Sequence, residues 1–134
     1  LAAFPKPPLL GGVTVLTSLS DAELGEIGFA GTAAANVERL ARLASASGLD
    51  GVVCSAEEAA LLRGALGPGF VTVTPGIRLA GDAKGDQSRV VTPGDAVRRG
   101  AHYLVIGRPV TQSADPAATL KSIVRSLEGE KASP

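Results

Sequence analysis

The sequence has 134 residues, enough for one domain with a core and short for two, so we expect residues 1–134 to form a single domain. Thirteen basic side chains balance thirteen acidic ones, and such a neutral chain has no general electrostatic reason to bind nucleic acid or an anionic membrane. Any anion site must therefore be local. The single cysteine, Cys54, excludes an intrachain disulfide and fits a reducing, cytoplasmic location. No apolar run approaches the roughly 20 residues of a membrane span.

The first ten residues are rich in proline and open on an apolar stretch, Leu1 to Phe4. This pattern predicts the end of a helix followed by a proline-rich link into the first strand. The sequence contains no methionine. We therefore expect the chain to begin inside a larger protein.

Taken in chain order, predicted strands and helices alternate. Runs of β-branched and aliphatic residues predict strands at residues 12–16, 49–54, 70–74 and 103–106. Capping residues and apolar stripes predict a short helix after Ser20 and longer helices at 33–47, 56–66, 93–99 and 116–127. Apolar strands without alternation indicate a parallel sheet covered on both faces. The period of about 30 residues is typical of a (β/α) barrel or a doubly wound sheet.

Polar residues mark where the predicted helices begin. Ser20 with Glu23, and Ser55 with Glu58, have the spacing of a capping box. Thr92 is followed by proline, a residue favoured in the first helical turn. Four strands are too few to close a barrel, so the two outer strands would be exposed apolar edges that something else must cover.

The third and fourth predicted strands each end in glycine and arginine. Residues 74–78 read Thr-Pro-Gly-Ile-Arg and residues 105–108 read Val-Ile-Gly-Arg. A glycine lets the backbone approach an anion closely, and an arginine supplies a planar fork of donors to the same oxygens. Because the carboxyl ends of parallel strands meet at one edge of a sheet, Arg78 and Arg108 are expected to hold one anion together.

A polar, glycine-rich segment at residues 79–91 separates the third strand from the next helix. It is too polar for a core and too long for a routine connection between a strand and a helix. We therefore predict a mobile loop there.

Five motifs in sequence order resemble the carboxyl-terminal half of bacterial orotidine 5′-phosphate decarboxylases. They are Val-Thr-Val-Leu-Thr-Ser (13–18), Gly-Leu-Asp-Gly-Val-Val-Cys-Ser (48–55), Thr-Pro-Gly-Ile-Arg (74–78), Gly-Asp-Gln-Ser-Arg (85–89) and Val-Ile-Gly-Arg-Pro-Val-Thr-Gln-Ser (105–113). That family is a homodimeric (β/α)8 TIM barrel that converts orotidine 5′-monophosphate to UMP and CO2 without metal or cofactor. The resemblance implies an α/β fold in which the four strands here are strands five to eight.

The resemblance also implies roles for particular residues. The N–H of Gly107 and the side chain of Arg108 would bind the substrate phosphate, and Arg78 would line the same site. Gln87 would close over the phosphate from the mobile loop. Thr17 and Ser18 would face the pyrimidine.

The family's catalytic Asp-x-Lys-x-x-Asp motif has no counterpart in this sequence. Asp82, Lys84 and Asp86 resemble it, but their spacing differs and they fall in the predicted loop. The resemblance therefore implies no catalytic residue and no metal ligand in this chain. A complementary N-terminal half would have to supply the catalytic residues. Alone, the chain is expected to be inactive.

Other interpretations of the same residues remain open. Another phosphate-binding barrel enzyme, such as a ribulose-phosphate epimerase or a hexulose-phosphate synthase, would share the glycine and arginine grip but not the Gly-Asp-Gln-Ser-Arg segment. A half-barrel without catalytic activity could instead bind phosphate or a partner protein through its exposed edges. Arg108 by itself could be a surface arginine at a strand end, and Thr17 and Ser18 could be a helix-capping pair.

Overall fold

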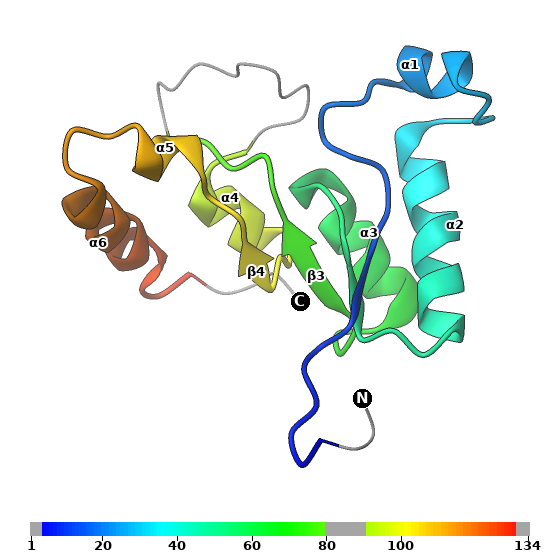
Figure 1. Cartoon of the computed structure of the whole chain (residues 1–134), viewed down its shortest axis with the longest axis horizontal. Helices are drawn as coiled ribbons and strands as arrows, with labels where there is room; N and C mark the ends of the chain where they lie inside the picture. The colour runs from blue at the N-terminus through cyan, green and yellow to red at the C-terminus, as the bar shows by residue number, and fades with distance from the viewer. Residues whose placement is uncertain (1–3, 80–90, 131–134) are drawn as a thin grey trace.

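A computed structural model describes residues 4–79 and 91–130 of the chain. Four parallel strands form one sheet in the order β1-β2-β3-β4, and helices follow the strands along the chain (Figure 1). The strands are β1 (Gly11–Val13), β2 (Gly51–Val53), β3 (Val71–Thr74) and β4 (Tyr103–Leu104). The helices are α1 (Asp21–Glu26), α2 (Ala33–Ala46), α3 (Ala56–Leu66), α4 (Pro93–Arg98), α5 (Arg108–Thr111) and α6 (Pro116–Leu127). The predicted α/β class and parallel order are confirmed.

The strands are shorter than the apolar runs predicted. β1 ends at Val13 and β4 at Leu104, two or more residues before the runs themselves end. Backbone pairing continues a little beyond each ladder, because Thr14 N donates to Val53 O at 3.2 Å and Val105 N donates to Thr74 O at 2.9 Å. The apolar residues beyond the ladders are therefore strand continuations that line the carboxyl edge of the sheet.

Polar caps begin α1, α2, α3 and α4, and three of them, Ser20, Ser55 and Thr92, are the caps named from the sequence. The side chains of Ser20 and Thr32 accept the backbone N–H of Glu23 and Ala35, at the starts of α1 and α2. In α3 the carboxylate of Glu58 accepts the backbone N–H of Ser55 at 2.9 Å. The side chain of Thr92 caps α4 in the same way, through the N–H of Asp95 at 3.3 Å. Each cap supplies a partner to a backbone group that the helix itself leaves unpaired.

Helix α5 is absent from the sequence prediction. It is a single turn, Arg108–Thr111, that begins directly after Gly107. Residue 109 is proline, which is tolerated in a first helical turn, but the segment is too short to show an apolar stripe. The turn matters because it fixes the position of Arg108 at the end of β4.

Two hydrophobic clusters form the core. The larger lies between β1, β2 and helices α1 to α3, and the smaller lies under α4 beside β3 and β4. The larger contains Val15, Leu24, Ala33, Val37, Ala41, Val52, Cys54, Leu62 and Phe70, and the smaller contains Ala56, Ile77, Ala96 and Ala101. Few of these side chains are large, as the low aromatic content requires.

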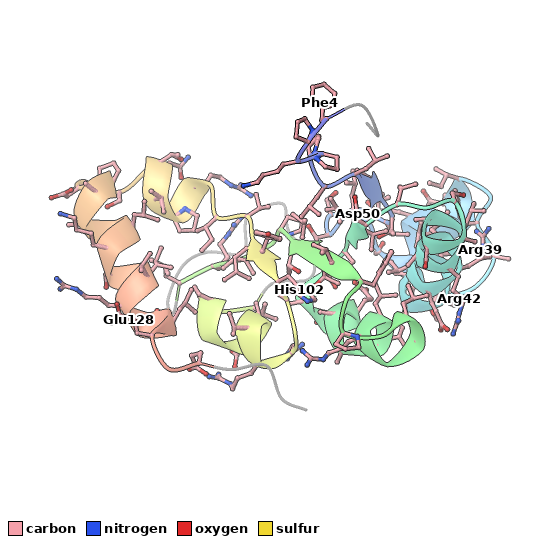
Figure 2. The ribbon with its side chains drawn as sticks, turned by 90° about the horizontal axis from the view of Figure 1, so that it is seen from below. Phe4, Arg39, Arg42, Asp50, His102 and Glu128 are labelled. Atoms are coloured by element: carbon pink, nitrogen blue, oxygen red, sulfur yellow. The ribbon has the colours of Figure 1, made fainter. Side chains whose placement is uncertain are left out.

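Among the described residues, helices cover one face of the sheet, whereas the sequence predicted that both faces are covered. Figure 2 views the molecule from below: the helices curve around one side of the sheet, and the N-terminal segment with Phe4 lies on the other. Val52 and Thr72 point to the helical side and are each 1% exposed. Val13, one strand over and on the other face, is 64% exposed. The strands therefore carry apolar residues on both faces, but among the described residues Val13 on the second face remains exposed.

The amino-terminal edge of the sheet is tied by a histidine. His102 Nδ1 lies 3.2 Å from Thr72 N and 3.0 Å from Thr72 Oγ1, and His102 Nε2 lies 3.2 Å from Pro68 O. This ring therefore links the start of β4 to the start of β3, far from the carboxyl edge where the polar motifs gather.

No helix within residues 4–79 and 91–130 is long and apolar enough to cross a membrane.

We predict that Gly51→Ala destabilises the fold, because the methyl carbon would lie 2.7 Å from the carbonyl carbon of Val71 on the neighbouring strand. The expected loss in free energy of unfolding is about 1–3 kcal/mol or more. Gly64→Ala in α3 is the matched control, since its methyl group meets open space. That variant should gain about 0.5–1 kcal/mol. Urea unfolding measures both, and equal effects at the two positions would contradict the packing described.

Candidate anion-binding site

A pocket of about 360 Å³ lies at the carboxyl edge of the sheet. Three segments far apart in the sequence line it: one after β1, one after β3, and one from the end of β4 into α5. The lining residues are Leu16, Thr17, Ser18, Pro75, Gly76, Arg78, Val105, Gly107 and Arg108. Among the described residues, this lining contains two guanidinium groups and no carboxylate. An anion is therefore the ligand that its charge favours.

Parallel pairing brings the two arginine motifs together. β3 and β4 pair at Val73 with Tyr103 and at Thr74 with Leu104. The bond from Val105 N to Thr74 O extends this pairing to the carboxyl edge. Arg78 and Arg108 each follow this last bonded position by three or four residues on neighbouring strands. They therefore reach the same pocket, as the sequence pattern predicts.

Arg78 is half-buried, and its guanidinium is only partly used. Its Nη1 donates to the carbonyl oxygen of Ile77 at 3.0 Å. Its Nη2 is buried and has no hydrogen-bond partner among the described residues. A buried donor without a partner costs about 1–3 kcal/mol, more when it is charged. A ligand oxygen in the pocket would satisfy this donor.

The backbone of Arg78 is fixed by the far end of the connection to α4. Arg78 N donates to Val91 O at 3.0 Å, and Val91 N donates to Gly76 O at 3.3 Å. Ile77 and Val91 thus form an isolated parallel bridge. The bridge ties two pocket residues, Gly76 and Arg78, to the residue that precedes the cap of α4.

Gly107 and Arg108 form the opposite wall. Gly107 caps α5 through its carbonyl, which accepts Val110 N at 2.9 Å and Thr111 N at 3.0 Å. A Cβ at Gly107 would meet no atom within 4 Å, so the backbone here is open to an approaching group. Arg108, the first residue of α5, is exposed, and its position is set by this single turn.

The third wall is mixed in polarity. Thr17 is buried at 4% exposure and Ser18 is half-buried, whereas Leu16 beside them is 53% exposed. Val105, across the pocket, is 50% exposed. Apolar side chains next to hydroxyl groups provide a surface for a flat, partly polar ring beside the basic end of the pocket.

Five of the six residues predicted to bind substrate therefore line one pocket: Thr17, Ser18, Arg78, Gly107 and Arg108. The sixth, Gln87, lies outside the described residues, as do Asp82, Lys84 and Asp86. The prediction did not include Leu16, Pro75, Gly76 and Val105, which also line the pocket. Pro75 and Gly76 lie inside the Thr-Pro-Gly-Ile-Arg motif, so the sequence could have placed them in the pocket together with Arg78. No sequence signal marks Leu16 and Val105, because apolar residues at strand ends normally enter a core.

An ionic network joins the cap of α4 to its last turn and to Glu130, beyond the end of α6. Asp95 accepts the hydroxyl of Thr92 at 2.7 Å and a guanidinium nitrogen of Arg98 at 2.5 Å. Arg98 also donates to Glu130 at 2.6 Å, which links α4 to the end of α6. The Thr92 hydroxyl, followed by the Arg98 guanidinium, lowers the pKa of Asp95 from its ordinary value. The hydrogen bonds of Arg98 with Asp95 and with Glu130 raise the pKa of Arg98.

The fold and the pocket define the chain as an open (β/α) unit of four parallel strands with a basic pocket at their carboxyl ends. Residues 2–123 match the family model described as orotidine 5′-phosphate decarboxylase / HUMPS family. The chain therefore belongs to this family.

Similar proteins agree with this assignment. An orotidine 5′-phosphate decarboxylase of Laribacter hongkongensis is 64% identical over 120 residues, covering 90% of this chain and 49% of that protein. One from Idiomarina loihiensis is 56% identical over 127 residues, covering 95% and 55%. The crystal structure of orotidine 5′-phosphate decarboxylase from Lactobacillus acidophilus matches with a TM-score of 0.73 and 39% identity, covering 88% of this chain and 48% of that one. The chain thus spans about half the length of its relatives, and its fold is half of their (β/α)8 barrel.

We predict that Asp95→Asn lowers the free energy of unfolding at neutral pH by less than about 1 kcal/mol, because the carboxylate is solvent-exposed and screened. A lowered folded pKa stabilises the fold above the unfolded value, near 3.9, and this stabilisation is lost as the pH falls through the folded value. The difference between wild type and variant should therefore stay constant from about pH 7 to 5 and shrink below about pH 4.

The control is the same substitution in a Thr92→Val background, which removes the hydroxyl that lowers the pKa of Asp95 most. The effect of Asp95→Asn should be smaller there. Urea unfolding across this pH range measures both differences. A difference that grows on acidification would contradict the hydrogen bonds described.

Proposed function

We propose that this chain is the phosphate-binding half of an orotidine 5′-phosphate decarboxylase, which converts orotidine 5′-monophosphate to UMP and CO2. One observation carries the proposal: Arg78 and Arg108 line a single pocket, and Nη2 of Arg78 is buried there without a partner among the described residues. A phosphate dianion would supply acceptor oxygens to both arginines. The names of the relatives favour this activity over that of other phosphate-binding barrel enzymes.

The pocket walls suggest how the substrate is oriented. The phosphate would lie at the basic end, held by Arg78, Arg108 and the N–H of Gly107. The pyrimidine would extend toward Thr17 and Ser18, with the exposed apolar side chains flanking it. Gln87 would contact the phosphate from the segment that precedes Val91. These roles extend the geometry of the pocket to the substrate that the family's name indicates.

The proton donor for the reaction would come from outside this chain. The lining of the pocket offers guanidinium and hydroxyl groups, and neither is an effective acid at neutral pH. We propose that a complementary N-terminal half supplies a lysine between two aspartates, which protonates C6 as CO2 leaves, with no metal or cofactor. The complete enzyme would be a cytoplasmic homodimer, and this chain by itself would not turn over.

Phosphate binding remote from the reacting carbon would still contribute to the rate. Contacts to a group that does not react can be used to order the site and exclude water, which lowers the barrier as well as holding the substrate. The bridge between Ile77 and Val91, with the bond from Arg78 N to Val91 O, would transmit such ordering. It joins the phosphate end of the pocket directly to the backbone of the connecting segment.

The first test asks where the catalytic groups lie. We predict that a chimera of the N-terminal half of the Laribacter hongkongensis relative with residues 1–134 decarboxylates orotidine 5′-monophosphate. The isolated chain, assayed at the same concentration by the absorbance change of the pyrimidine, should show no turnover. Turnover by the isolated chain would contradict an external proton donor, and a folded but inactive chimera would contradict the proposed activity.

The second test concerns the phosphate contact. In the active chimera, Arg108→Ala should lower kcat/KM by roughly one and a half to three orders of magnitude. This corresponds to a loss of about 2–4 kcal/mol of transition-state stabilisation, because a charge-assisted contact is removed. Most of the change should appear in KM. Arg42→Ala is the matched control, because Arg42 lies on α2 and pairs with Glu38 on the outer surface, away from the pocket (Figure 2). Equal kinetics for the two variants would remove Arg108 from the site.

A further inference from the structure

The ladder between β3 and β4 is the shortest in the described sheet, although the two arginine motifs follow these strands. It joins two residue pairs, whereas the ladder of β1 with β2 and that of β2 with β3 each join three. A slip of one residue along a strand moves a side chain by about 3.3 Å and turns it to the other face of the sheet. The position of Arg108 relative to Arg78 therefore depends on how firmly this short ladder is held.

His102, the one histidine of the sequence, adds side-chain bonds where this ladder begins. It lies where the chain passes from α4 into β4 (Figure 2). Val71 N donates to Asp50 O, on the side of β2, so the next N–H along the strand, that of Thr72, points toward β4. There it meets Nδ1 of the His102 ring at 3.2 Å. The ring thus supplies an acceptor to a strand donor at the start of the ladder.

The partners of the ring decide which nitrogen carries the proton. A backbone N–H can only donate, so Nδ1 of His102 must accept from Thr72 N. A carbonyl oxygen can only accept, so Nε2 must donate to Pro68 O. The neutral tautomer protonated at Nε2 meets both requirements. The other tautomer and the imidazolium would each direct an N–H at the N–H of Thr72, so the ring is held in one form and one orientation.

We propose that His102 is a positioning residue for the phosphate site. By accepting the N–H of Thr72 it fixes β4 along β3, and so holds Arg108 opposite Arg78. The bond joins two neighbouring strands within the described sheet, so this role does not depend on what lies beyond β1 and β4. It does rest on the phosphate site proposed above.

The path from His102 to the pocket is short. Val105, which lines the pocket, follows His102 by three residues. Val105 N donates to Thr74 O at 2.9 Å, so the pairing that starts at the histidine continues to the pocket wall. A shift of β4 at His102 is therefore passed on to Arg108, three residues beyond Val105.

NMR of the imidazole nitrogens tests the assigned tautomer. In the chimera described above, isotope-labelled at histidine, the signals of His102 are identified by their loss in the His102→Asn variant. At neutral pH we expect a protonated Nε2 and an unprotonated Nδ1. A ring protonated at Nδ1, alone or together with Nε2, would overturn the proposal.

Two substitutions separate the two bonds of the ring. The amide of Asn lies near the position of Nδ1, and that of Gln near the position of Nε2, so only His102→Asn keeps an acceptor for Thr72 N. His102→Gln should raise KM of the chimera by about three- to tenfold with kcat unchanged, and His102→Asn should leave KM unchanged. His102 is exposed, so circular dichroism should show both variants folded. Equal KM values for the two variants would overturn the proposal.

A double substitution shows whether His102 acts through Arg108. In an Arg108→Ala background no guanidinium is left to position, so His102→Gln should have no further effect on KM. A purely structural role would instead multiply the effects of the two substitutions. That result would overturn the proposal.

Inorganic phosphate separates the positioning role from the proposed activity. Calorimetric titration of the same chimera variants with phosphate measures the pocket without turnover, and only His102→Gln should weaken binding. A chimera that binds phosphate in this order but does not decarboxylate refutes the activity and supports the role of His102. A chimera that decarboxylates, with equal phosphate affinity in both variants, refutes the role of His102 alone. No phosphate binding by the unsubstituted chimera would also overturn that role.

Discussion

Parallel pairing of four short strands is the constraint on which the rest of this structure depends. Each strand contributes only two to four residues to the sheet, yet the shared direction gathers every strand end at one edge. The bond from Val105 N to Thr74 O keeps β3 and β4 together up to that edge. Two arginines that lie 30 residues apart in the sequence thereby share a pocket. With antiparallel strands, the same motifs would lie at opposite ends of the sheet.

The same constraint leaves the sheet incomplete. A parallel sheet places its crossover helices on the faces, and in the described part of the chain the neighbouring helices α2, α3 and α4 lie on one face. The other face keeps an apolar row that water contacts at Val13 and Tyr103. The relatives that the chain matches are about twice its length, and their barrel is closed where this sheet has open edges. The basic pocket and the open edges are thus two consequences of one half-barrel.

The pocket is built mainly by backbone interactions, which explains how so small a unit can hold an arginine in place. Arg78 is fixed at its N–H by Val91 and at its guanidinium by the carbonyl of Ile77. Neither bond involves an acidic side chain. A carboxylate partner would neutralise the guanidinium, whereas carbonyl partners leave its charge available to a ligand. The pocket residues that the structure describes around it include no acidic side chain.

The sequence by itself determined the order of the elements, most of their helical boundaries and five residues of the pocket. Caps such as Ser20 and Thr92 act within a few residues, so local sequence is enough to place them. Only the tertiary structure decided that β1 and β4 are short, that one face is open, and that Leu16 and Val105 line the pocket. These features depend on what a residue contacts across the sheet. The sequence pattern of an apolar residue is the same whether its side chain faces a helix, a cavity or water. The single turn of α5 likewise follows from the position of Gly107 at the sheet edge, which no local pattern records.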